Sequence, residues 1–152
     1  MQPQAATKRG RPTPRRAGAL AVAVALTVVP ALAEPSPPRE RIELGARERE
    51  HMKAGMRAYL ESIQGIVAGL ARHDFRAVAR AAGRSGKAAI KDVSPALALS
   101  LPPQFTLMSV DTHERFDALA KDALGLRTNL AVQKRLDDVL TNCTAYHAMY
   151  RF

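Results

Sequence analysis

Residues 42–72 read IELGAREREHMKAGMRAYLESIQGIVAGLAR, and apolar side chains recur along this stretch at steps of three and four residues. Such steps place side chains on one face of an α-helix. At the end of the stretch, Arg72 and His73 bring positive charge to the position where a helix dipole favours it. The stretch therefore predicts one long amphipathic helix whose buried stripe is Met52, Met56, Tyr59, Leu60, Ile63, Ile66, Val67 and Leu70.

Three further helices are expected downstream. Asp74 is placed to cap a short second helix that ends at Gly83, and a loose stretch with three prolines follows, in which a turn of helix is expected over residues 95–99. Asp111 with Glu114 three residues later matches a capping box, which predicts the start of the third helix.

The fourth helix is expected to start at a cap on Thr128 or Asn129 and to run almost to the C-terminus. Its predicted stripe is Val132, Leu136, Val139, Leu140, Cys143, then Tyr146 or His147, then Tyr150. Aromatic residues make up only 5% of the chain and tryptophan is absent, which fits a helical protein. The sequence thus predicts an all-α domain folded as an antiparallel four-helix bundle.

The N-terminal residues have the pattern of an export signal. Basic residues precede the uncharged apolar run 17–29, Pro30 interrupts it, and Ala31-Leu32-Ala33 fits a signal-peptidase site. We expect a signal peptide over residues 1–33, a disordered leader over 34–41 and the folded domain over 42–152, which would act in the periplasm, free of the membrane after cleavage. An uncleaved N-terminal anchor is the alternative.

The positive charge of the chain is concentrated in this same N-terminal stretch. The formal net charge is +9, but five basic residues and no acidic ones lie in residues 1–33. The rest of the chain has 18 basic and 14 acidic residues. Basic residues interleaved with aromatic ones, as nucleic-acid-binding surfaces have them, are not found in the sequence. A nucleic-acid partner is therefore not expected.

The chemically informative segment is CTAYHAMYR, residues 143–151. Cys143, the single cysteine, and His147 are four residues apart and so share one face of a helix. A thiol beside an imidazole can hold a metal or a cofactor. His51 and His113 are expected at the surface and have no metal-ligand spacing, so a zinc site is not predicted.

This segment resembles the last helix of the cytochrome c-prime superfamily, which consists of exported four-helix-bundle c-type haem proteins. Those helices end in Cys-x-x-Cys-His followed by x-x-Tyr-Arg, and the likeness continues upstream. The matching residues are Cys143, His147, Tyr150 and Arg151, then Glu50-His51-Met52, then Leu60, Ile63, Ala71, Asp74 and Phe75, then Thr112, His113 and Phe116. The resemblance implies one-electron transfer or gas binding, redox partner proteins, and a homodimer through the first two helices.

The resemblance also implies a role for each matching residue. Cys143 would form a haem thioether, His147 would be the proximal ligand of the haem iron, and Arg151 would pair with a haem propionate. Met52 would be the distal ligand in the branch that has one, with Met56 as the next choice.

The chain departs from the family motif at Tyr146, which stands where the second cysteine belongs. Three interpretations follow: haem held by a single thioether at Cys143, haem held without a covalent bond, or a bundle that folds without haem. Tyr146 as an iron ligand is a fourth.

A haem-free bundle would be a structural or interaction protein, with Cys143 available to bridge two chains. A nucleophile with its base and acid is not found in the sequence, so an enzyme is not predicted.

Overall fold

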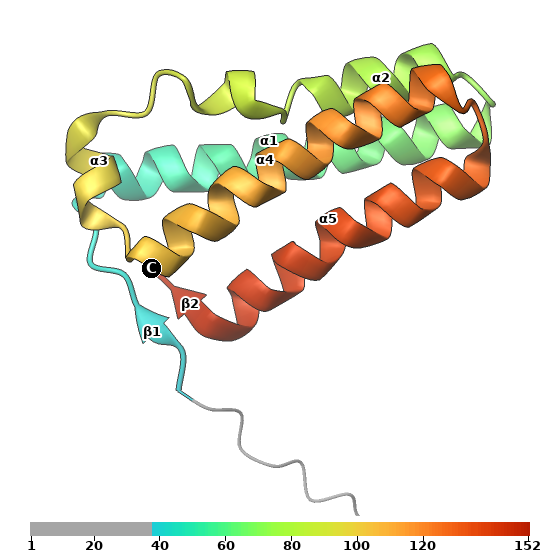
Figure 1. Cartoon of the computed structure of the whole chain (residues 1–152). Coiled ribbons are helices and arrows are strands. Elements are labelled where there is room, and N and C mark those ends of the chain that lie inside the picture. Colours follow the sequence, from blue (N-terminus) through green and yellow to red (C-terminus); the bar gives the residue numbers. More distant parts are fainter. Residues whose placement is uncertain (1–37) are drawn as a thin grey trace, which may run out of the picture. The chain divides into compact units, whose positions relative to one another are not determined.

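The computed structural model describes residues 38–152, and these residues form an all-α domain (Figure 1). The expected signal peptide and residues 34–37 of the expected leader lie outside the described part. In this part of the chain no helix is both long and apolar enough to cross a membrane. The elements are β1 (Glu40–Arg41), α1 (Ala46–Ala71), α2 (Phe75–Gly83), η1 (Lys87–Ile90), α3 (Pro95–Ser100), α4 (Pro103–Gly125), α5 (Asn129–Met149) and β2 (Tyr150–Arg151).

The turn between α1 and α2 is short and closed by local hydrogen bonds. His73 adopts a left-handed backbone conformation with φ of 52°, and histidine is one of the residues that tolerate this region. Directly after it, the side chain of Asp74 accepts a hydrogen bond from the backbone N–H of Ala77 at 2.9 Å. Asp74 is therefore the N-cap of α2, as the sequence predicts.

Two glycines let α1 and α2 approach closely. A Cβ atom at Gly69 would lie 2.7 Å from Cγ2 of Val78, and one at Gly65 would lie 2.8 Å from Cβ of Ala81. Because Gly65 and Gly69 are one helical turn apart, they form a smooth strip against which α2 packs. This contact contributes Val78, Ala81 and Ala82 to the main hydrophobic core.

The third long helix begins earlier than the capping box predicts. Helix α4 starts at Pro103, eight residues before Asp111, and Pro103 occupies the first turn, where a missing N–H costs nothing. The side chain of Asp111 instead accepts hydrogen bonds from Arg115 at 2.7 Å and from Asn142 at 2.6 Å. Helix α5 begins as expected, since the hydroxyl of Thr128 accepts from the N–H of Ala131.

The chain between α2 and α4 is less loose than the sequence suggests. It contains the 3₁₀ turn η1 and the short helix α3, whose N-cap Ser94 accepts from the N–H of Leu97 at 3.2 Å. Helix α3 covers the turn expected over residues 95–99. In Figure 1 this segment runs back alongside the long helices toward the N-terminal end of α1.

The two ends of the described chain meet in a two-residue parallel sheet. Glu40 pairs with Tyr150 and Arg41 with Arg151, and the N–H of Ile42 donates to the carbonyl of Arg151 at 2.8 Å. The expectation of disorder up to residue 41 is therefore wrong for these two residues, which strand pairing fixes in place. Beside this sheet lies a second hydrophobic core made of Ile42, Leu44, Leu97, Phe105 and Tyr150.

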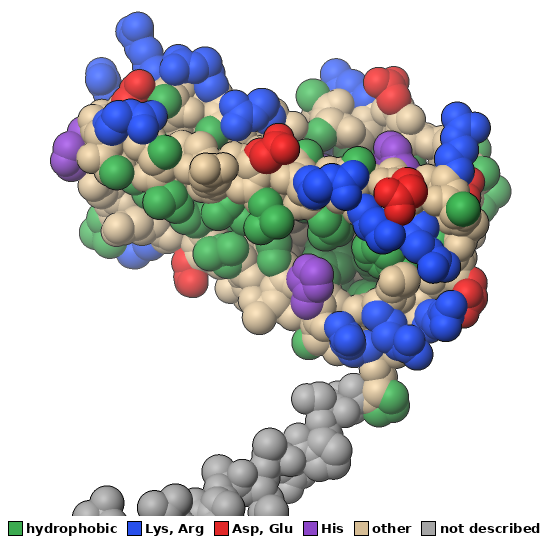
Figure 2. Space-filling model, turned by 180° about the vertical axis from the view of Figure 1, so that it is seen from behind, with side chains coloured by type: hydrophobic (Ala, Val, Ile, Leu, Met, Phe, Trp, Pro, Cys, Tyr) green, Lys and Arg blue, Asp and Glu red, His purple; other side chains and the backbone are tan. Residues whose placement is uncertain are grey.

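The predicted apolar stripes are only partly buried. Leu60 and Val67 of α1 are 67% and 52% exposed, and Leu140 of α5 is also exposed, so these three predictions are wrong. The main core is built from α1, α2, α4 and α5, with Ile66, Phe116, Leu119, Val132 and Val139 fully buried. On the face seen in Figure 2, hydrophobic side chains extend over the surface between groups of lysines and arginines.

Candidate ligand pocket

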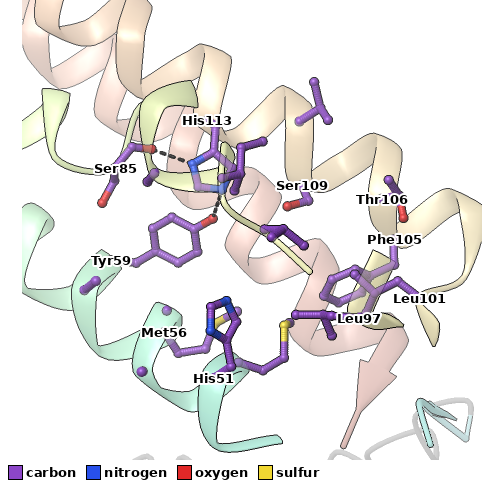
Figure 3. A pocket seen from close by; sticks show the side chains of 18 of the residues that line it. His51, Met56, Tyr59, Ser85, Leu97, Leu101, Phe105, Thr106, Ser109 and His113 are labelled. Atoms are coloured by element: carbon purple, nitrogen blue, oxygen red, sulfur yellow. Dashed lines mark hydrogen bonds between the residues drawn. The ribbon is translucent and has the colours of Figure 1, made fainter. Parts of the chain in front are cut away.

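A cavity of about 420 Å³ lies between α1, the segment of η1 and α3, and α4. Its wall is largely apolar, and a single residue of α5, Tyr146, reaches it. The side chains on which the argument below depends are His51, Met52, Met56, Tyr59, Arg84, Ser85, Phe105, Thr106, Ser109, His113 and Tyr146, most of which Figure 3 labels. This size is within the range of small-molecule sites in proteins, about 300–1,000 Å³.

His113 forms a polar point in this apolar wall. It is only 4% exposed, so the prediction of a surface position is wrong. Its Nδ1 lies 2.7 Å from the carbonyl oxygen of Ser85 and its Nε2 lies 2.7 Å from the hydroxyl of Tyr59, as the dashed lines in Figure 3 show. Helix α4 starts early, which places His113 one turn before the buried Phe116 and on the same side of the helix.

Tyr59 holds the other end of this contact. Its ring stacks on that of Phe116, with centroids 5.6 Å apart and planes 6° apart. Burial raises the pKa of the Tyr59 hydroxyl well above its ordinary value, with smaller contributions from Tyr146 and Cys143. Behind His113, the buried hydroxyls of Ser62 and Ser85 lie 2.8 Å apart. Helices α1 and α4 are thus joined through the segment that carries Ser85.

The two methionines considered as iron ligands both lie at the pocket. Met52 and Met56 are one turn apart on α1, half-buried, and line the wall together with His51, which is exposed as the sequence predicts. Figure 3 shows His51 and Met56 on the α1 side, across from His113. The pocket therefore presents thioether sulfurs from one helix and an imidazole from another.

Tyr146 lies at the position of the missing cysteine, and it packs into the pocket wall. Its ring centroid is 4.9 Å from that of Phe105, and its hydroxyl donates to the carbonyl of Phe105 at 3.2 Å. Burial raises the pKa of Tyr146 to about 12. A phenol in this environment stays protonated at neutral pH, so Tyr146 acts here as a packing side chain and a hydrogen-bond donor.

The other residues of the C-terminal motif lie outside the pocket wall. Of the two residues expected to continue the buried stripe, Tyr146 takes the inward position of this turn and His147 is exposed. Cys143 is half-buried against the main core, and burial raises the pKa of its thiol. Arg151 is exposed and donates from Nε to the carbonyl of Arg39 at 3.4 Å.

This geometry bears on how a haem group would be held. Neither Cys143 nor His147, the residues expected to form the thioether and to bind the iron, lines the cavity. A group held in the cavity without a thioether would meet Met52, Met56, Tyr59 and His113. Among the described residues, no group of three or more His, Cys, Asp or Glu side chains could hold a metal ion.

Comparison of the chain with protein-family models, with curated proteins and with solved structures gives no match.

Tyr59, Ser85, Ser109 and His113 are pocket residues that we did not predict. For His113 the sequence does contain a signal, because its three-residue spacing from Phe116 places both on one helix face. The assumed helix start at Asp111 concealed that signal, since it put His113 in an exposed first turn.

Proposed function

We propose that this protein is a non-enzymatic binding protein whose pocket holds a small, mainly apolar ligand without a covalent bond. The observation that carries the proposal is the cavity of about 420 Å³ between α1, α3 and α4. A wall of methionine, leucine and aromatic side chains favours apolar molecules, and the few polar groups on it fix their orientation.

The finer architecture and the place of action belong to the same proposal. Helices α1, α2, α4 and α5 would form an antiparallel four-helix bundle, since α1 packs on α2, α2 on α4, and α4 on α5. The export signal proposed for residues 1–33 would deliver the domain to the periplasm. The apolar pocket would then collect its ligand outside the cytoplasm.

Two glycine substitutions test the pocket directly. A side chain at Gly55 would meet no atom within 4 Å at its Cβ, and Gly55 lines the pocket, so Gly55→Phe adds a ring at the pocket wall. Gly83 is equally open at its Cβ but lies outside the pocket wall, so Gly83→Phe is the matched control. Binding of an apolar fluorescent naphthalene dye is expected in the native protein and in Gly83→Phe, and to be lost in Gly55→Phe. Equal dye binding by both variants would remove the support for this pocket.

Haem held without a thioether is the second candidate ligand, and the observation in its favour is that Met52 and Met56 both line the pocket. A methionine thioether is an established axial ligand of haem iron. The resemblance of the C-terminal motif to c-prime cytochromes points the same way. In that case the bound iron would supply one-electron transfer or gas binding, and redox proteins and a second copy of the chain would be its partners.

An absorption spectrum with a pyridine haemochrome assay tests this candidate. The full chain is exported in a host that has haem-attachment machinery, with Tyr146→Cys beside it. A Soret band that acid-acetone extracts is expected if haem is held non-covalently, and Met52→Leu is then expected to shift it. A band that resists extraction would instead support a single thioether at Cys143. Colourless, folded native protein beside red Tyr146→Cys would identify a haem-free relative.

A further inference from the structure

The chain of hydrogen bonds at His113 has a fixed direction. The carbonyl oxygen of Ser85 can only accept, so Nδ1 of His113 must donate to it over the 2.7 Å contact. A neutral imidazole has one N–H, and Nε2 is therefore an acceptor. It follows that the hydroxyl of Tyr59 donates its proton to Nε2. The ring is 4% exposed, and its described hydrogen-bond partners, the carbonyl of Ser85 and the hydroxyl of Tyr59, are both uncharged.

The direction of these bonds decides what Tyr59 offers to a ligand. Its proton is engaged by His113, whereas its oxygen keeps a lone pair that can accept a second hydrogen bond. A ligand carbonyl or ether oxygen would have to take that proton, which would leave buried Nε2 without a partner and cost its desolvation. A ligand O–H or N–H group can donate to the Tyr59 oxygen and leave the hydrogen bonds from Tyr59 to His113 and from His113 to Ser85 intact.

We infer that the pocket selects an uncharged, mainly apolar molecule that carries one hydroxyl or N–H group, which donates to the hydroxyl oxygen of Tyr59. The inference rests on the proposed binding function and names the class of ligand. A cationic amine is disfavoured, because no Asp or Glu is among the described residues of the pocket wall. The rings of Tyr59, Phe105 and Tyr146 on that wall suit a phenol or a ring-bearing alcohol.

Besides the exposed His51, three other polar side chains on the wall are considered separately. The hydroxyl of Thr106 donates to the carbonyl of Pro102 at 3.4 Å, within its own helix. Arg84 is exposed, so water screens its charge. A ligand that bound through Arg84 would carry a carboxylate, which the benzoate probe below tests. Ser109 lies one turn before His113 on α4, and its hydroxyl can donate as well as accept. Loss of the phenol preference in Ser109→Ala would therefore assign the polar contact to Ser109 and overturn the inference.

Binding of four small probes to the full chain, followed by calorimetry or ligand-detected NMR, tests the inference. The probes are 4-butylphenol, 4-butylanisole, 4-butylacetophenone and 4-butylbenzoate, which differ only in the polar group on the ring. The phenol is expected to bind roughly fivefold more tightly than the ether and the ketone, the worth of one hydrogen bond. Since the ether is the more apolar molecule, a pocket without a free acceptor would prefer it.

Substitution of His113 provides the sharper readout. In His113→Leu the Tyr59 proton is released while its oxygen can still accept, so the ketone is expected to gain on the phenol and the preference for the phenol over the ketone to shrink. Gly83→Phe, which lies outside the pocket wall, is expected to keep the native preference. If His113→Leu does not fold, the comparison in that variant is replaced by a search for NOE contacts between the bound phenol and the Tyr59 ring in the native protein.

Each outcome of the probe series decides something. Phenol binding that is no tighter than ether binding, or tightest binding of the benzoate, overturns the inference and leaves the apolar pocket standing. An unchanged ratio of phenol affinity to ketone affinity in folded His113→Leu, or the absence of NOE contacts to Tyr59, also overturns it. Failure of all four probes to bind contradicts the proposed binding function itself.

Discussion

The hydroxyl of Tyr59 lies 2.7 Å from Nε2 of His113, although the two residues are 54 positions apart in the chain. The first belongs to α1 and the second to α4, and these helices enclose the pocket. Because His113 also donates to Ser85, three separate segments are joined at one imidazole. The contact therefore couples the stability of the domain to the shape of its pocket.

Loss of the imidazole is expected to destabilise the domain. His113→Leu removes both contacts and leaves the buried carbonyl of Ser85 unpaired, at a cost of about 1–3 kcal/mol in the free energy of unfolding. Urea denaturation followed by circular dichroism measures it. A double-mutant cycle with Tyr59→Phe is expected to give a coupling energy of about 0.5–1.5 kcal/mol. Strict additivity of the two changes would show that the 2.7 Å contact contributes nothing to stability.

The close packing of α1 on α2 gives a second prediction. Gly69→Ala and Gly55→Ala gain about the same helix propensity, up to about 1 kcal/mol. Only at Gly69 does the new methyl group meet another atom, Cγ2 of Val78 at 2.7 Å, whereas nothing lies within 4 Å at Gly55. Overpacking of this kind costs about 1–3 kcal/mol.

Thermal melts of the two variants measure that difference. Gly55→Ala is expected to unfold at a higher temperature than the native protein, and Gly69→Ala at a lower one. A Gly69→Ala variant as stable as Gly55→Ala would mean that α1 and α2 are farther apart than the structure has them.

The sequence predicts the long helices well because their periodicity and caps are local signals. Helix α1 was expected from residue 42 and begins at Ala46, since Ile42 and Leu44 lie in extended chain and are buried by the second core. Asp74 and Thr128 cap helices as predicted. The early start of α4 was missed because Pro102 and Pro103 resemble a loop, although proline is favoured in a first helical turn.

The pocket could not be predicted in the same way, because it depends on how the segment of η1 and α3 crosses α1 and α4. Hydrophobic periodicity describes one helix at a time and does not encode that crossing. Met52 was identified from the family motif and does line the cavity, whereas Cys143 and His147 were identified with it and do not. The difference arises at Tyr146, whose large ring takes the inward position of the last turns of α5.

The contact of Asp111 with α5 predicts a pH dependence. The hydrogen bond from Asn142, and then that from Arg115, lowers the pKa of Asp111 below its ordinary value of 3.8. A carboxyl with a lowered pKa in the folded state contributes stability above the unfolded pKa, and this contribution is lost as the pH falls through the folded pKa. The native protein is therefore expected to lose stability below about pH 4.

Urea denaturation at a series of pH values between 2 and 6 checks this contribution. Asp111→Asn is expected to be less stable than the native protein at pH 6 and to show a flatter pH profile below pH 4, whereas Asn in place of the exposed Asp137 is the control. Parallel profiles for the native protein and Asp111→Asn would show that another carboxyl is responsible.

The half-buried thiol of Cys143 predicts slow chemistry at neutral pH. Burial raises the pKa of the thiol and so lowers the fraction of reactive thiolate, and packing against the main core limits access to the sulfur. Labelling with iodoacetamide at pH 7 is expected to be slower than for glutathione, because the smaller thiolate fraction and the limited access both reduce the rate. Denaturation in urea is expected to restore the glutathione rate. Rapid labelling of the folded protein, or a dimer on a non-reducing gel that Cys143→Ser abolishes, would favour instead the alternative in which this cysteine bridges two chains.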